Sequence, residues 1–355
     1  MNDVSILLPL PTTTETGALP RASDQGAKGE LLPWAVIEGF DTLFHRRDQR
    51  VTYSALRALG IRIDPCFKEK GICHRQIRLV WQPVLSVGGQ ISTLDAAVHS
   101  FYELSAEEFA QALADLEKLE RESGVQTAAL PLGIHPAAKA QGVNGAFVTG
   151  IRSFLTKFAG QKNLTRATAM FTRGPGNILW GFSGVDIVDG KPQVMIVPRT
   201  GNRTLQTFVN RSMPGTDYDR PVITPNLEPG EDVLEWLLGD TPVLTDAPES
   251  AIIDDMISAA KIQNPEIHSP ETMDCVSCHT SGPSLALGLR FFPALKDKAE
   301  GATFRSSFDL SNHTVHKDHT RNLRAFGYFG NEPAFSQRLI NESAAIAQAL
   351  NQGQR

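Results

Sequence analysis

The sequence predicts an α+β N-terminal domain with an antiparallel sheet, followed by a mostly α C-terminal domain. The 355 residues exceed what one hydrophobic core usually holds, which favours two domains. Between residues 165 and 198, apolar, β-branched and aromatic runs are separated by Gly-Pro-Gly and Asp-Gly turns, a pattern typical of an antiparallel meander. After residue 248 the apolar residues recur at helical spacing. The expected units are an extended tail at 1–30, the α+β domain at 31–220, a Pro-rich, acidic connection at 221–247 and the C-terminal domain at 248–355.

The first domain is expected to mix short helices and strands. Residues 92–119 predict one or two helices, and Ser105 with Glu108 forms a capping box where the second would start. Pro33 suits the first turn of an earlier helix, where a missing N–H costs nothing. The other expected elements are a strand within 4–10, a helix at 33–44, a strand at 76–84, a helix at 146–158 and strands at 165–172, 178–187 and 193–198.

Two amphipathic helices are predicted for the C-terminal domain, at 249–262 and 336–352, from apolar residues three or four positions apart. Between them, Ser269 and Pro270 predict the start of a short helix, because Ser caps helices and Pro fits the first turn. This helix would run into Cys275.

Composition excludes two classes of partner. A net charge of −5 and scattered Lys and Arg residues give no basic field for a polyanion, so nucleic acid is not an expected partner. The apolar stretches are far shorter than a bilayer span, so no transmembrane segment is expected. Residues 1–11 lack the charged start and long apolar run of an export signal. We therefore expect a mature chain or a misassigned start, and a removed N-terminal segment would be the place for a membrane tether.

The run Cys275-Val276-Ser277-Cys278-His279 carries the clearest chemical signal in the chain. On a helix, residues three and four apart share one face, so two thiols and one imidazole converge on a small surface. Two thioether bonds and one axial nitrogen need that convergence, and Cys-x-x-Cys-His is a signal for covalent c-type haem attachment. The motif predicts one haem c per chain, attached at Cys275 and Cys278, with His279 as the proximal iron ligand.

Two other interpretations of Cys275 and Cys278 stay open. One is a disulfide, and the other is half of a tetrahedral zinc site completed by Cys66 and Cys73. Zinc is disfavoured because six residues separate Cys66 from Cys73, rather than two to four. A local Cys66–Cys73 disulfide is expected instead, which agrees with a periplasmic or otherwise exported bacterial protein.

Residues 249–355 resemble a monohaem cytochrome c domain, with a leading helix, the haem motif, an irregular middle and a closing amphipathic helix. The resemblance covers less than a third of the chain. It implies that the second ring nitrogen of His279 is anchored on a backbone carbonyl near Pro283 or Pro293. The family's common downstream Met ligand is missing, since no Met follows Met273.

A histidine is therefore the expected sixth ligand. His316 is the first candidate, followed by His313 and His319, with one ligand at most among the three. His268 is a further candidate, although it precedes the motif closely. Bis-His ligation would give a lower reduction potential than a His/Met site.

Electron transfer with a redox protein partner is the leading function, because a six-coordinate haem exchanges electrons through its exposed edge. The alternatives are a peroxidase-like haem enzyme and a haem-based redox or gas sensor, which both need an open distal position. The enzyme would use His316 as a base and Arg321 or Arg324 to stabilise charge.

No catalytic residue is assigned to the first domain, which is expected to act as a docking module. Its histidines His45, His99 and His135 lie in unrelated contexts and show no ligand spacing.

Overall fold

The computed structural model describes residues 1–13, 17–40, 49–69, 71–127, 130–173, 179–209, 222–224, 227–228, 230, 232–234, 248–311 and 325–353. Its main feature is a ten-stranded sheet made of β1 (Ser5–Leu7), β4 (Leu56–Glu69), β5 (Ile72–Val87), β6 (Gln90–Thr93), β7 (Ala96–Glu103), β8 (Leu164–Arg173), β9 (Leu179–Val188), β10 (Lys191–Val194), β11 (Leu205–Val209) and β12 (Val222–Thr224). The order is β1-β4-β5-β7-β8-β9-β11-β12, with β6 beside β5 and β10 beside β9. Every pairing is antiparallel, which confirms the predicted α+β fold with an antiparallel sheet.

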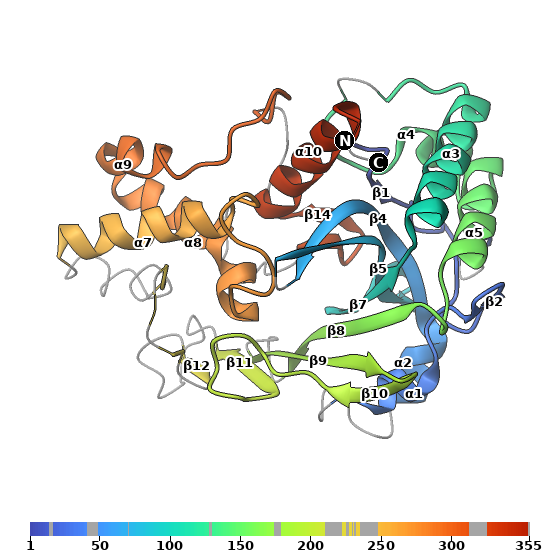
Figure 1. The fold of residues 1–355 in the computed structure, drawn as a ribbon, viewed down its shortest axis with the longest axis horizontal. Coiled ribbons are helices and arrows are strands. Elements are labelled where there is room, and N and C mark those ends of the chain that lie inside the picture. The colour runs from blue at the N-terminus through green and yellow to red at the C-terminus, as the bar shows by residue number, and fades with distance from the viewer. Residues whose placement is uncertain are drawn as a thin grey trace.

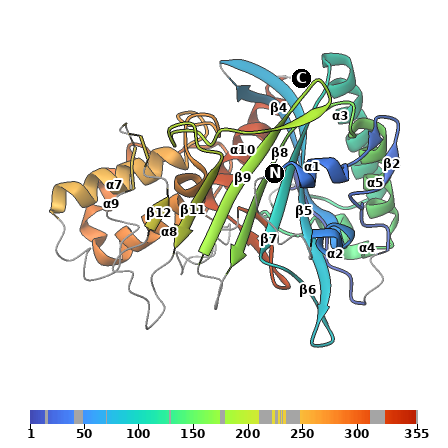
Figure 2. The same ribbon diagram turned by 90° about the horizontal axis from the view of Figure 1, so that it is seen from below.

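Helices lie on both sides of this sheet, as Figures 1 and 2 show. On one side are α3 (Ala106–Ser123), α4 (Pro136–Gln141) and α5 (Ala146–Phe158). On the other are α7 (Glu249–Ile262), α8 (Cys275–Phe291), the 3₁₀ turn η1 (Pro293–Leu295), α9 (Lys296–Glu300) and α10 (Gln337–Asn351). The short elements β2 (Gln25–Gly26), β3 (Gly29–Glu30), α1 (Trp34–Glu38) and α2 (Gln49–Ala55) precede β4 along the chain.

The central strands are buried on both faces. In β5 and β7, Trp81 and Tyr102 belong to the core that also includes Phe109 of α3 and Phe147 of α5. Side chains alternate between the two faces of a strand, so their neighbours in sequence point toward α8 and α10. The sheet therefore separates a closed hydrophobic core from a second face that is available for a site.

The prediction of helices across residues 92–119 is wrong in its first half. Residues 90–93 form β6 and residues 96–103 form β7, the central strand of the sheet. Because β7 is covered on both faces, its sequence lacks the polar alternation that marks a half-exposed strand. The second half is confirmed, since α3 begins at Ala106 behind a capping box of Ser105 and Glu108.

The first residues are part of the fold. β1 lies within the predicted strand at 4–10, and Ile6 pairs with Ile61 of β4. The Ser5 and Ser343 hydroxyls share a buried 2.7 Å hydrogen bond, which ties β1 to α10. This segment therefore packs into the core, which differs from the extended tail expected for residues 1–30.

The end of the chain returns to the sheet. β13 (Phe326–Phe329) and β14 (Glu332–Phe335) form a hairpin, and the Gln82 side chain on β5 bonds both the N–H and the carbonyl of Tyr328 (2.8 and 2.9 Å). Gly327 allows this approach, because its φ is +139° and an added Cβ would lie 2.3 Å from Gln82 Oε1. Residues 325–353 thus share one core with the sheet.

The helices predicted at 249–262, 336–352 and 146–158 are confirmed as α7, α10 and α5. The start predicted at Ser269 is wrong: the Thr272 hydroxyl donates to the Ser269 carbonyl to close a turn, and α8 begins only at Cys275. Most of the expected connection at 221–247 lies outside the described residues.

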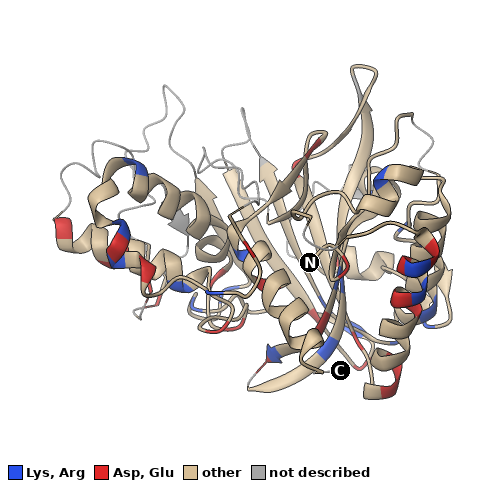
Figure 3. Ribbon diagram, turned by 90° about the horizontal axis from the view of Figure 1, so that it is seen from above, with Lys and Arg blue, Asp and Glu red and all other residues tan. Residues whose placement is uncertain are grey.

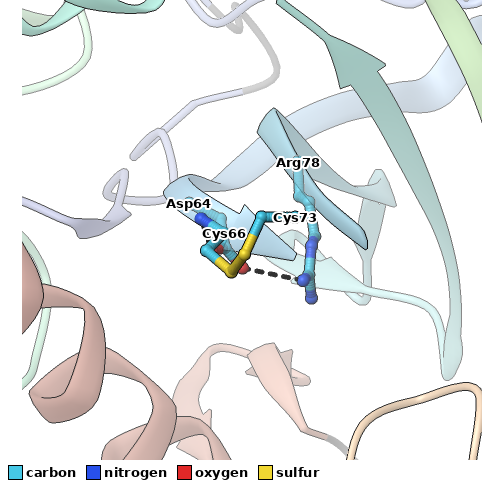
Figure 4. The surroundings of a disulfide bond; sticks show 4 residues. All are labelled: Asp64, Cys66, Cys73 and Arg78. Atoms are coloured by element: carbon cyan, nitrogen blue, oxygen red, sulfur yellow. Dashed lines mark hydrogen bonds and ion pairs between the residues drawn. A yellow bond between two sulfur atoms is a disulfide. The ribbon is translucent and has the colours of Figure 1, made fainter. Parts of the chain in front are cut away.

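Cys66 and Cys73 form a disulfide where β4 meets β5, with their Cα atoms 4.4 Å apart (Figure 4). The predicted pairing is therefore confirmed. Next to it, Arg78 Nη2 donates to Asp64 Oδ2 (2.9 Å), and Asp64 Oδ1 accepts from the backbone N–H of Cys66 (3.0 Å). The disulfide and this ion pair together hold the end of the β4–β5 hairpin beside the second face of the sheet.

Among the described residues, none of the helices has both the length and the apolar character that crossing a bilayer would require. Acidic and basic residues are interspersed along the helices at both ends of the molecule in the view of Figure 3.

Candidate functional site

A cavity of about 520 Å³ lies between the second face of the sheet and the helices α8 and α10. Cys275, Cys278 and His279 line it from α8, and the central strands β4, β5, β7, β8 and β9 line it from the other side. Its volume falls within the roughly 300–1,000 Å³ of sites that hold small molecules and cofactors. The structure therefore brings the predicted haem motif to a site of suitable size.

The start of α8 presents the motif. Asp274 is the N-cap, and its Oδ1 accepts from the backbone N–H of Ser277 (3.0 Å). Because the helix begins at Cys275, both thiols and the imidazole lie in its first five residues, on one face. The His279 ring packs against the Phe182 ring of β9, with centroids 5.0 Å apart.

Gln206 of β11 holds this first turn against the sheet. Its Nε2 donates to Asp274 Oδ1 (2.7 Å), and its Oε1 accepts from the backbone N–H of Val276 (3.0 Å). Both Gln206 and Asp274 are fully buried, so neither partner has water as a substitute. Nothing local in the sequence marks Gln206, whereas Asp directly before Cys275 was a readable N-cap signal.

Gln206→Ala is expected to lower the free energy of unfolding by about 2 kcal/mol, because it leaves the buried Val276 N–H without a partner and removes one of the two hydrogen bonds to Asp274 Oδ1. Urea unfolding of the whole chain measures this. Gln111→Ala is the matched control, since Gln111 Nε2 makes an equally long bond to Asp115 Oδ1 (2.7 Å) on the exposed face of α3. The control should change stability by less than about 0.5 kcal/mol. Equal effects at the two positions would contradict a structural role for the Gln206 clamp.

The two cysteines of α8 are free thiols. Burial raises the pKa of Cys278 to about 11 and raises the pKa of Cys275 further above its usual value. A redox-active Cys-x-x-Cys pair has a lowered thiol pKa, so these cysteines lack that property. The zinc alternative also loses support, because Cys66 and Cys73 are joined to each other. The described residues contain no group of three or more His, Cys, Asp or Glu side chains that could hold a metal ion.

His99 lies on the sheet side of the same cavity, which the sequence did not predict. It belongs to β7, whose Ala97 and Phe101 point to the same face two residues away on either side. Burial and then the charges of His279 and Arg78 lower the pKa of His99 to about 3, so its imidazole is neutral at pH 7. The structure thus places one histidine on each side of the cavity.

Charged side chains form one end of the cavity. Arg62 of β4 pairs with Glu342 of α10, whose Oε1 also accepts from Arg338 Nε (2.8 Å). Arg338 Nη2 donates in turn to the His268 carbonyl (2.7 Å), which joins α10 to the loop before α8. Arg78 completes the group from β5. This network fixes α8 and α10 relative to the sheet.

Some polar atoms of the cavity have no protein partner among the described residues. They are Nε of Arg62, Nε of Arg78, Oδ2 of Asp274 and Oγ of Ser183, and all four are buried. Guanidinium N–H groups are suited to carboxylates, and a haem carries two propionates. The two thiols and the imidazole of α8, the imidazole of β7 and the guanidinium groups of Arg62 and Arg78 line one cavity and are a donor set that fits a covalent haem.

The downstream candidates His313, His316 and His319 lie outside the described residues, as do Arg321, Arg324 and His45. His268 does not line the cavity: its Nε2 contacts Asp232 (2.9 Å) and its Nδ1 contacts Thr272 (3.0 Å). His135 is also elsewhere, stacked on Phe147 with centroids 4.2 Å apart. Pro283 lies inside α8 and Pro293 opens η1, and the anchoring of His279 near either proline stays a prediction.

Comparison with family models, with curated proteins and with solved structures gave no match for this chain. The resemblance of residues 249–355 to a cytochrome c domain therefore stays a prediction that rests on the sequence motif and its flanking helices.

Proposed function

We propose that this chain is an exported c-type cytochrome that holds one covalent haem in the cavity between α8 and the sheet. The observation that carries the proposal is the position of Cys275, Cys278 and His279 on the cavity wall. Each thiol would add across one haem vinyl group, so that an S–H bond and the C=C π bond are replaced by S–C and C–H bonds without net oxidation. His279 would supply the proximal axial nitrogen.

The surrounding residues have defined roles in this proposal. The Gln206–Asp274 clamp orients the first turn of α8, and the guanidinium groups of Arg62 and Arg78, which line the cavity, would receive the propionates. The sheet excludes water from one side of the cavity, which lowers the local polarity and so influences the potential. Bound there, the haem would supply one-electron redox chemistry.

Electron transfer to or from a redox protein partner is the activity that best suits such a site. A six-coordinate haem exchanges electrons through its exposed edge and does not require a pocket for a substrate. The residues on the outside of the sheet and helices carry mixed charge, which suits a transient partner. The Cys66–Cys73 disulfide is compatible with the oxidising compartment in which such a protein would work.

An absorption spectrum of the oxidised and reduced protein, produced with the cytochrome c maturation machinery, tests this function. We expect low-spin bands that do not change when carbon monoxide is added, since both axial positions are filled. A high-spin spectrum that responds to carbon monoxide would contradict electron transfer as the main role and would favour a haem enzyme or a gas sensor.

A further inference from the structure

We propose that His99 is the sixth ligand of the haem iron, opposite His279. The proposal rests on the proposed haem site, and it replaces the downstream histidines with a residue of the first domain. It makes the sheet part of the redox centre, so that one iron would be held by β7 and α8 together.

The register of the sheet places His99 at the centre of the cavity floor. Five strands line the cavity in the order β4-β5-β7-β8-β9, and β7 is the middle one. His99 pairs with Val80 on β5 and with Thr168 on β8, and both neighbours line the cavity beside it. A side chain in the middle of the sheet side of the cavity is placed to contact the face of a haem bound there.

The residues paired with His99 on the neighbouring strands have short side chains. Val80 and Thr168 are both shorter than the imidazole. On the same strand, Ala97 adds only a methyl group. Compared with Val80, Thr168 and Ala97, His99 has the longest side chain, and it is the member of this group that can coordinate a metal.

His99 has no hydrogen bond to its ring among the described residues, although it is enclosed by the strands on both sides. The His99 side chain is half-buried and lines the cavity, so its ring is accessible to a group bound there. His279 lines the same cavity from α8, whereas His99 lines it from the sheet. Bis-His ligation needs two imidazoles on opposite walls of one cavity.

Three methionines also line the cavity, and each has a packing role. Met170 belongs to the cluster that joins Trp180 and Phe208 to α7 and α8, and Met273 lies in that same cluster. Met195 is packed against the backbone at Gly184, where an added Cβ would lie 2.7 Å from its Cε. None of the three lies at the centre of the floor, so His99 is the better candidate.

His99→Ala in the haem-loaded full chain tests the ligand directly. We expect the low-spin spectrum to be lost, a high-spin spectrum to replace it, and carbon monoxide to bind. Added imidazole should restore the low-spin bands by filling the vacated space. His74→Ala is the matched control, because His74 does not line the cavity and its Nδ1 contacts Glu103 Oε1 (2.8 Å) elsewhere, so its replacement should leave spin state and carbon monoxide response unchanged.

The outcomes separate this inference from the proposed function. A His99→Ala protein that keeps the wild-type low-spin spectrum would overturn His99 as the ligand, while the covalent haem would stand. A wild-type protein that is already high-spin would also overturn it, since no sixth ligand would be present. A chain without haem would overturn the proposed function itself.

A second variant keeps the test decisive if His99→Ala does not fold. His99→Met retains a long side chain that can coordinate iron through sulfur, and a thioether ligand raises the reduction potential above that of a bis-His site. We therefore expect a higher potential than in the wild type. An unchanged potential would overturn the inference.

Discussion

Replacing Cys275 and Cys278 together with alanine is expected to reduce covalently bound haem from one per chain to none. The two thiols are the only sulfurs of the motif, and both lie on the cavity wall at the start of α8. Each single variant should keep one thioether bond and therefore some covalent haem. Haem staining of the denatured chain on a gel measures this, because only covalently attached haem stays with the polypeptide.

The other cysteine pair is the matched control for this experiment. Cys66 and Cys73 are joined to each other at the β4–β5 hairpin, and neither sulfur lines the cavity. Replacing both with alanine should leave the haem stain at the wild-type level. Haem that persists in the Cys275/Cys278 double variant would contradict the assignment of the attachment site.

Glu342→Gln is expected to lower the free energy of unfolding by about 3 kcal/mol, because it leaves buried arginine charges without their counter-ion. The Glu342 side chain is 13% exposed, and those of Arg62 and Arg338 are 7% and 6% exposed. Urea unfolding at neutral pH measures the loss. Glu300→Gln is the control: Glu300 pairs with Lys296 across 3.7 Å on the surface, where side chains are 56% and 66% exposed. The control should change stability by less than about 0.5 kcal/mol.

The stabilisation by Glu342 is expected to depend on pH. Burial alone would raise the pKa of Glu342, but the positive charges of Arg62, Arg338 and Arg78 outweigh it and lower the pKa to about 2. A carboxyl with a lowered folded-state pKa stabilises the fold above its unfolded value of 4.5 and loses this contribution as the pH falls through about 2. The stability difference between wild type and Glu342→Gln should therefore shrink between about pH 5 and about pH 2. A difference that stays constant over this range would show that the charge of Glu342 is not what stabilises α10.

Much of the fold could be predicted because its signals are local. The capping box at Ser105 and Glu108, the helical spacing of α7 and α10, and the turns of the β8–β10 meander all lie within short windows. The Cys66–Cys73 disulfide was also local, since seven positions separate the two residues. Local signals of this kind predict individual helices and strands, but they do not predict which side chains line the cavity between them.

The candidate site was predictable only in part, because half of it depends on pairings between distant strands. The motif on α8 is contiguous, whereas His99 and Gln206 are brought to it from β7 and β11 across the sheet. β7 was mistaken for helix, since it is buried on both faces and its apolar residues show no alternation. With β7 misassigned, the face on which His99 lies could not be predicted, and the ligand was sought downstream of the motif.

The most direct test of the central claim is the mass of the whole wild-type chain after denaturation, when it has been produced with the cytochrome c maturation machinery. A covalent haem predicts that the unfolded chain carries the mass of one haem, held at Cys275 and Cys278 in the peptide that contains both. A chain that has only the mass of its amino acids under these conditions would contradict the account and would leave the cavity between α8 and the sheet for a different ligand.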